Sequence, residues 1–95
     1  MVGMAAVRVL DERRMFGRGF VQIVVWALNE PVPPSEHRFK YRMVYVVEGV
    51  RVVGYDNERG KGDHRHLGSQ ERIYVFRDVP TLVRDFWEDV KEAAR

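Results

Sequence analysis

The chain has 95 residues, of which 45% are hydrophobic and 12% aromatic, and it carries a formal net charge of +2. These values exclude a disordered polypeptide and favour one small globular domain over residues 1–95. No cysteine is present, so a disulfide framework, thiol catalysis and cysteine-ligated metal sites are excluded.

We expect neither a membrane-spanning segment nor a secretory segment in this sequence. The longest apolar run, residues 20–28, is interrupted by Gln22 and is much shorter than the roughly 20 residues of a membrane span. The N-terminal stretch lacks a basic start and Arg8 breaks its apolar run, so we expect no signal peptide. Together with the lack of cysteine, these features predict a soluble cytoplasmic protein that does not contact a membrane.

The first part of the chain predicts two strands and a stiff connector. Residues 4–15 form the first expected strand, and the two glycines of FGRG, residues 16–19, supply a turn. Residues 20–29 are apolar at both odd and even positions, which is typical of a central strand. The next segment, residues 30–36, contains three prolines, and proline cannot donate to a sheet ladder. We therefore expect a connector there.

A third strand is expected over residues 37–47, where aromatic and basic side chains alternate. One face carries Phe39, Tyr41, Met43 and Tyr45, and the other carries Arg38, Lys40 and Arg42. Glu48-Gly49 predicts a short hairpin turn, from which residues 50–56 return antiparallel. After a loop, a further strand is expected over residues 71–78.

The C-terminal segment predicts a helix. Asp78 is a suitable N-cap, and Pro80 suits a first helical turn. Apolar residues recur at helical spacing, at Leu82, Val83, Phe86, Val90 and Ala93. The expected fold class is α+β: an antiparallel sheet of about five strands, built from β-hairpins, with one C-terminal helix packed on one face.

Positive charge gathers in the middle of the chain. Residues 37–66 contain seven lysine or arginine side chains against four carboxylates, whereas residues 80–95 contain three against four. A basic segment of this kind favours a polyanionic partner. The alternating Arg38, Lys40 and Arg42 are the candidate phosphate-binding row, although a solvated sheet face has the same composition.

The segment YDNERGKGDHRH, residues 55–66, holds two of the three histidines. In an extended chain His64 and His66 point to the same side, with Asp56 a few residues before them. Three roles are open for this segment. It could bind a metal ion, although no known ligand spacing is present, or it could carry out acid–base chemistry, since imidazole titrates near neutral pH. It could also be a solvated loop that begins with a turn. Acid–base cleavage of RNA is the favoured use, with cations such as Lys61 to hold the phosphate.

The stretch VVGYDNERGKGDHRHLGSQERIYVF, followed by LVRDFWEDV, resembles the TumE-like family of toxins from type II toxin–antitoxin modules. The resemblance runs over residues 38–91 and comprises a Tyr-Asp-Asn strand end, a His-x-His, an aromatic strand and a helix with an Asp-Phe pair. It implies a toxin encoded beside an antitoxin, often one with a DNA-binding helix-turn-helix. The motif positions that it carries over are Tyr55, Asp56, Asn57, His64 and His66.

Residues and resemblance together predict a toxin that cleaves RNA by metal-independent acid–base catalysis, without a cofactor. Its expected catalytic residues are His64, His66 and Asp56. Its expected substrate-binding residues are Asn57, Tyr55, Lys61, Arg38, Lys40 and Arg42.

The aromatic and amide side chains carry more specific expectations. Asn57 is expected to position either the loop or a phosphate oxygen. Tyr41 or Tyr55 would stack on a base if its ring were exposed. For Tyr41 core packing is the favoured role, because it shares a face with three other large side chains.

Two other functions remain open on this sequence. A non-catalytic module would bind nucleic acid or a protein through the basic sheet face, with the Tyr-Asp-Asn and His-x-His segments as loop structure. A metal-dependent nuclease would instead use the histidines and aspartates as ligands. The uncovered sheet face is also a candidate interface for a homodimer.

Overall fold

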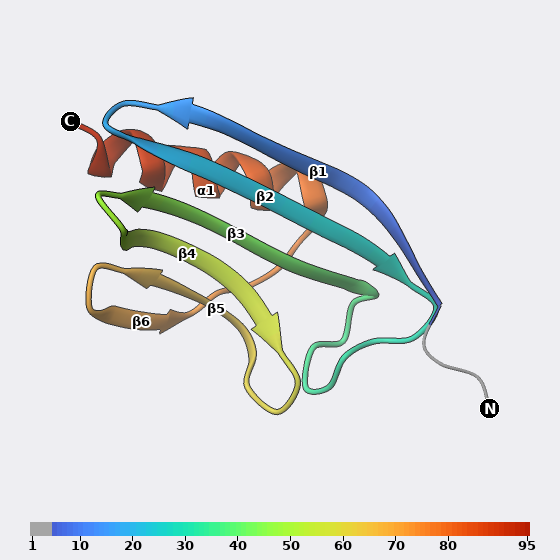
Figure 1. The fold of residues 1–95 in the computed structure, drawn as a ribbon. Helices are drawn as coiled ribbons and strands as arrows, with labels where there is room; N and C mark the ends of the chain where they lie inside the picture. Colours follow the sequence, from blue (N-terminus) through green and yellow to red (C-terminus); the bar gives the residue numbers. More distant parts are fainter. Residues whose placement is uncertain (1–4) are drawn as a thin grey trace.

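A computed structural model of the protein describes residues 5–95. Within this range the chain forms one antiparallel sheet of six strands, followed by one helix, α1 (Val79–Ala93) (Figure 1). The strands are β1 (Ala6–Phe16), β2 (Gly19–Leu28), β3 (Phe39–Val47), β4 (Val50–Glu58), β5 (Gly62–Leu67) and β6 (Gln70–Ile73). Each strand pairs with the next along the chain, so the sheet is a meander. The predicted α+β fold class is confirmed, and no helix in these residues is long and apolar enough to cross a membrane.

The helix α1 covers one face of the sheet, and its apolar stripe supplies the contact. Leu82, Phe86 and Val90 have no exposed surface. On the sheet side the core consists of Val21, Ile23, Val25, Tyr41, Met43, Tyr45, Val53 and Tyr55. Asp78 is the N-cap, as predicted, and its carboxylate accepts a hydrogen bond from the backbone nitrogen of Thr81 at 2.7 Å.

The other side of the sheet, which we call the uncovered face, lies away from α1 (Figure 1). Side chains alternate across a strand, so the residues between the core positions point to this face. The register places Arg42 of β3 opposite Asp56 of β4, and Asp56 opposite His64 of β5. Two residues away along each strand, and on the same face, Gly54 stands opposite His66.

The hairpin between β3 and β4 has the two-residue turn that the sequence predicts. Glu48 and Gly49 both have positive φ, 52° and 77°, as a turn that follows the twist of the strands requires. The register then shifts between Tyr45 and Val46, so that Arg51 pairs with Val46. This irregularity is a β-bulge, and it re-aims the side chains that follow the turn.

Most strand boundaries lie within two residues of the predicted ones, and larger differences occur at β5 and β6. Residues 62–67 form β5, where the sequence predicted a loop, because Asp63 and Arg65 find hydrogen-bond partners far along the chain, on Tyr41 and Asp89. The strand expected over 71–78 ends at Ile73, because Tyr74 turns into the core and donates its hydroxyl to Asp85 at 2.7 Å. The first strand begins at Ala6, and its expected start at residue 4 lies outside the described residues.

Phe86→Ala tests the packing of α1 on the sheet. The ring is fully buried and makes edge contacts with Tyr55 and Trp87, so we expect a loss of about 3–5 kcal/mol in the free energy of unfolding. Glu88→Ala, on the exposed side of the same helix, should change it by less than about 0.5 kcal/mol. Chemical denaturation measures both, and a loss below about 1 kcal/mol for Phe86→Ala would contradict the packing.

Candidate functional site

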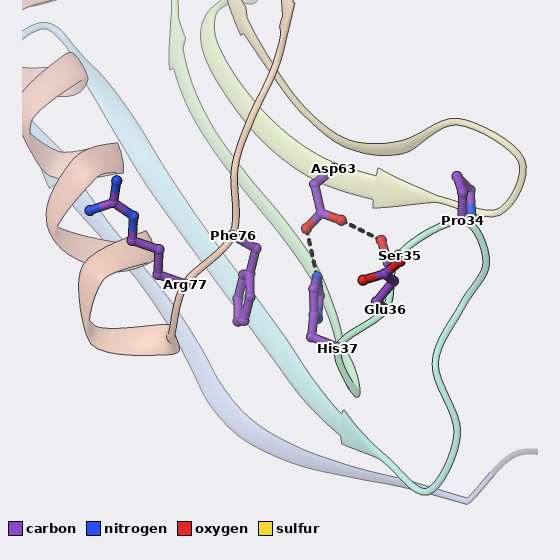
Figure 2. A pocket seen from close by; sticks show the side chains of 7 residues that line it. All are labelled: Pro34, Ser35, Glu36, His37, Asp63, Phe76 and Arg77. Atoms are coloured by element: carbon purple, nitrogen blue, oxygen red, sulfur yellow. Dashed lines mark hydrogen bonds and ion pairs between the residues drawn. The ribbon is translucent and has the colours of Figure 1, made fainter.

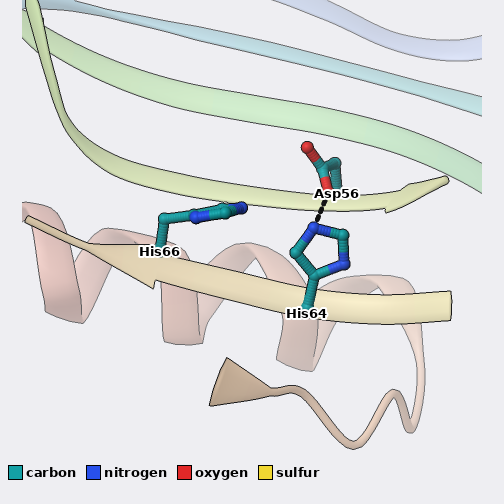
Figure 3. Close-up of side chains that lie close together, drawn as sticks. All are labelled: Asp56, His64 and His66. Carbon is teal, nitrogen blue, oxygen red and sulfur yellow. Dashed lines mark ion pairs between the residues drawn. The ribbon is translucent and has the colours of Figure 1, made fainter. Parts of the chain in front are cut away.

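Three polar side chains converge on the uncovered face, where β4 pairs with β5. Asp56 comes from β4, and His64 and His66 come from β5 (Figure 3). The antiparallel register sets Asp56 directly across from His64. One oxygen or nitrogen atom from each side chain lies within 4.8 Å of the other two. We call these residues the Asp56–His64–His66 cluster.

His64 is the most enclosed member, with a side chain that is 5% exposed. Its Nδ1 lies 2.9 Å from the carbonyl oxygen of Gly62, and because a carbonyl only accepts, Nδ1 carries the hydrogen. Its Nε2 lies 2.7 Å from Asp56 Oδ1 and 3.2 Å from Glu71 Oε2. Both Nε2 and Asp56 Oδ1 are buried and lack a hydrogen-bond partner. The short distance between them is therefore an electrostatic contact and not an aligned hydrogen bond.

His66 is the more accessible ring, with a side chain that is 17% exposed. Its Nε2 lies 3.5 Å from Glu71 Oε2, and its ring meets that of His64 edge-on, with 5.0 Å between centroids. Burial, and then the positive charge of Arg51, lower the pKa of His66, while Glu71 acts in the opposite direction. His66 is therefore neutral at neutral pH, the form in which an imidazole accepts a proton or binds a metal.

The predicted basic row runs along the same face. Arg42 is exposed and stands opposite Asp56. Lys40 is half-buried, and its Nζ donates to the backbone oxygen of Asn57 at 2.8 Å. Arg38 is exposed just before β3 begins. Arg42 is thus the member of the row that stands nearest to the cluster in register.

Glu71 of β6 approaches the cluster from the other side. It stands opposite His66 in the β5–β6 register and accepts a hydrogen bond from Lys61 Nζ at 2.7 Å. This contact lowers the pKa of Glu71 and raises that of Lys61. Lys61 therefore lies beside the cluster, with its charge directed at Glu71.

The remaining two motif residues lie on the helix side of the sheet. Tyr55 has no exposed surface and donates its hydroxyl to Asp89, and burial together with that hydrogen bond raises its pKa. Asn57 holds the backbone of β3: its Oδ1 accepts from the nitrogen of Tyr41 at 2.9 Å, and its Nδ2 donates to the oxygen of Phe39 at 2.7 Å. Core packing of Tyr41 is confirmed. Neither tyrosine ring is exposed, so neither meets the condition under which stacking on a base was expected.

Two charged neighbours of the cluster were not among the predicted site residues. Arg51 lies over Gly54, since a Cβ added at Gly54 would come within 2.9 Å of Arg51 Cδ, and Gly54 stands opposite His66. This position depends on the bulge after the turn, for which the sequence holds no signal. Glu71 could have been found, because the two-residue turn at Gly68-Ser69 places it opposite His66.

A second polar cluster lies under the proline-rich connector, beside a surface cavity of about 410 Å³ (Figure 2). Asp63 accepts hydrogen bonds from the Ser35 hydroxyl, from the Tyr41 hydroxyl at 2.7 Å and from His37 Nε2 at 2.6 Å. The Nδ1 of His37 accepts from a backbone N–H at 3.2 Å, and its ring stacks on Phe76 with 3.7 Å between centroids. Both nitrogens of His37 are occupied, so this cluster fastens the connector to β5.

A family described as Toxin TumE matches residues 5–94. The chain belongs to the TumE toxin family. The match confirms the family, and its range includes all six strands and the helix. A toxin role follows for this TumE chain, and with it an antitoxin partner. No curated protein and no solved structure matched the chain.

In this TumE domain, Arg51→Met should raise the pKa of His66. The methionine keeps a long side chain over Gly54 but removes the positive charge that disfavours the protonated ring. NMR titration of the imidazole signals in a chelating buffer measures the shift, with Arg59→Met in the exposed β4–β5 turn as the control. If the His66 titration were the same in Arg51→Met and wild type, Arg51 would not face this ring.

Proposed function

We propose that this toxin acts on RNA and cleaves phosphodiester bonds at the Asp56–His64–His66 cluster. The observation that carries the proposal is the meeting of two imidazoles and a carboxylate on the uncovered face, with the exposed Arg42 opposite in register. Membership of a toxin family supports it, because a toxin needs an essential cellular target. The expected antitoxin is a DNA-binding helix-turn-helix protein, and the expected location is the cytoplasm.

The chemistry of RNA cleavage matches the groups at this site. The reaction needs an activated oxygen nucleophile, a proton for the leaving oxygen and positive charge near the phosphate. Imidazole and carboxylate groups serve the first two needs, either directly or through a bound ion. Arg42 and Lys40 serve the third, because their cations bind phosphate oxygens. His66 is the more exposed ring, so a substrate would approach the cluster from its side.

The uncovered face also offers aromatic rings next to arginines. The guanidinium of Arg8 lies 5.9 Å from the ring centroid of Trp26, and that of Arg13 lies 4.2 Å from the centroid of Phe20. Trp26 also stands opposite Lys40 in the β2–β3 register. Proteins hold single-stranded nucleic acids with rings and cations combined in this way. These residues support single-stranded RNA as the substrate class.

Substitutions in the cluster should abolish toxicity. His66→Ala, His64→Ala and Asp56→Asn are each expected to lower the rate of RNA cleavage by at least about 10²-fold, because each removes a group used for proton transfer or for ion binding. Growth on induction and gel analysis of total RNA measure the effect. Arg59→Ala, in the exposed turn beside the cluster, is the control and should stay toxic.

Circular dichroism establishes that the inactive variants are folded. Folded variants that remain fully toxic would refute the cluster as the active site. The non-catalytic alternative, a module that binds through the basic face, would then account for toxicity.

Arg38→Ser combined with Arg42→Ser should flatten the salt dependence of RNA binding. Each contact to a single-strand phosphate adds about 0.7 to the slope of log K against log salt, so the slope should fall by up to about 1.4. Fluorescence anisotropy with a labelled RNA measures it, in a His66→Ala background that prevents cleavage. Arg84→Ser with Lys91→Ser removes the same charge from exposed positions of α1 and should leave the slope unchanged. Equal slopes for both pairs would mean that RNA does not follow the basic row.

A further inference from the structure

Two buried atoms of the cluster, His64 Nε2 and Asp56 Oδ1, have no hydrogen-bond partner. Burying a polar atom without a partner costs free energy, so such atoms in a folded protein require an explanation. They lie 2.7 Å apart, and Glu71 Oε2 lies 3.2 Å from the same nitrogen. The buried nitrogen therefore faces two carboxylate oxygens.

The tautomer of His64 makes this arrangement more specific. Because Nδ1 donates to the Gly62 carbonyl, a neutral ring presents a lone pair at Nε2. A lone pair and carboxylate oxygens repel one another at these distances, and a cation that all of them contact turns the repulsion into attraction. A backbone carbonyl bound to the far nitrogen is also the arrangement that orients metal-ligating histidines in proteins.

We propose that Asp56, His64 and His66 bind a divalent transition-metal ion, with Zn²⁺ as the best match. Their ligand atoms lie within 4.8 Å of one another, and two imidazoles with a carboxylate suit Zn²⁺ and its neighbours in the first transition row. Mg²⁺ and Ca²⁺ take oxygen ligands instead. Three protein ligands leave one coordination position open, as in catalytic zinc sites.

Glu71 borders the open side of this site. Its Oε2 lies 3.2 Å from His64 Nε2 and 3.5 Å from His66 Nε2, and the side chain is 41% exposed. Lys61 holds it from the solvent side. Glu71 is thus in place to be a fourth ligand or to accept a hydrogen bond from a water on the ion.

The metal site deepens the proposed function. Ion binding itself does not depend on RNA cleavage, but the role of the ion in the reaction rests on the proposed function. A bound divalent ion supplies a Lewis acid for a phosphate oxygen and lowers the pKa of a bound water to about 7. Metal-independent chemistry, as expected from the sequence, needs His64 Nε2 to reach the substrate, but that atom is buried. As a ligand, His64 serves the reaction without touching RNA.

Calorimetric titration of the full chain, without a polyhistidine tag and dialysed against chelator, tests the site directly. Zn²⁺ is the probe, and the expected result is one ion per chain; Mg²⁺ should give no saturable signal. His66→Ala and Asp56→Asn should each weaken Zn²⁺ binding by at least about tenfold. Two exposed controls outside the cluster, Glu58→Gln and Glu88→Gln, should bind Zn²⁺ like the wild type.

Co²⁺ gives a second readout, because its visible absorption bands report nitrogen and oxygen ligation. The bands should form in the wild type and be lost in the folded His66→Ala and Asp56→Asn variants. A folded wild type without stoichiometric Zn²⁺ binding, or cluster variants that bind as the wild type does, would overturn the metal site.

Failure of the metal site and failure of the proposed function give different results. RNA cleavage in chelator by a chain that binds no Zn²⁺ would overturn the metal site and leave RNA cleavage standing. Zn²⁺ binding as expected, with no RNA cleavage in the presence or absence of the ion, would overturn the proposed function and leave the metal site standing.

Discussion

The antiparallel register of β4 against β5 is the constraint on which the site depends. Asp56 faces its histidine partner only in this register, and a slip of one residue would send the side chains of one strand to the opposite face. Contacts beneath the sheet hold the register. Asn57 bonds to the backbone of β3, and Tyr55 and Arg65, from the two paired strands, both reach Asp89 on α1. Buried polar contacts on the helix side thus position the groups on the uncovered face.

Much of the fold could be predicted because alternation and helical spacing are visible in the sequence. The aromatic row of β3 and the stripe of α1 each have one apolar side, and each packs as that pattern indicates. The sequence did not predict β5 as a strand because polar side chains point to both of its faces. Its histidines face outward, while Asp63 and Arg65 point to the helix side and bond to Ser35 and Asp89, partners distant in sequence. No local sequence pattern indicates hydrogen bonds between residues so far apart in the chain.

The candidate site was predictable to a similar extent. The two-residue spacing of the histidines was enough to place them on one side of an extended chain, and the strand period brings Asp56 to the same face. The position of Arg51 was not predictable, because it depends on a bulge after the hairpin turn. The hydrogen on His64 Nδ1 was not predictable either, because it depends on where the Gly62 carbonyl points.

Gly62 connects the proline-rich segment to the histidine on the opposite face. Its φ of 80° strains any other residue at this position, and an added Cβ would lie 3.1 Å from Pro34 Cγ, so that Pro34 would have to shift. Two residues earlier, the Gly60 nitrogen donates to the oxygen of Pro33 at 2.9 Å. The proline-rich connector therefore packs against Gly62, whose carbonyl oxygen accepts a hydrogen bond from His64 Nδ1. The position of the connector is thus coupled to the orientation of His64 through one glycine, by contacts that do not involve the uncovered face.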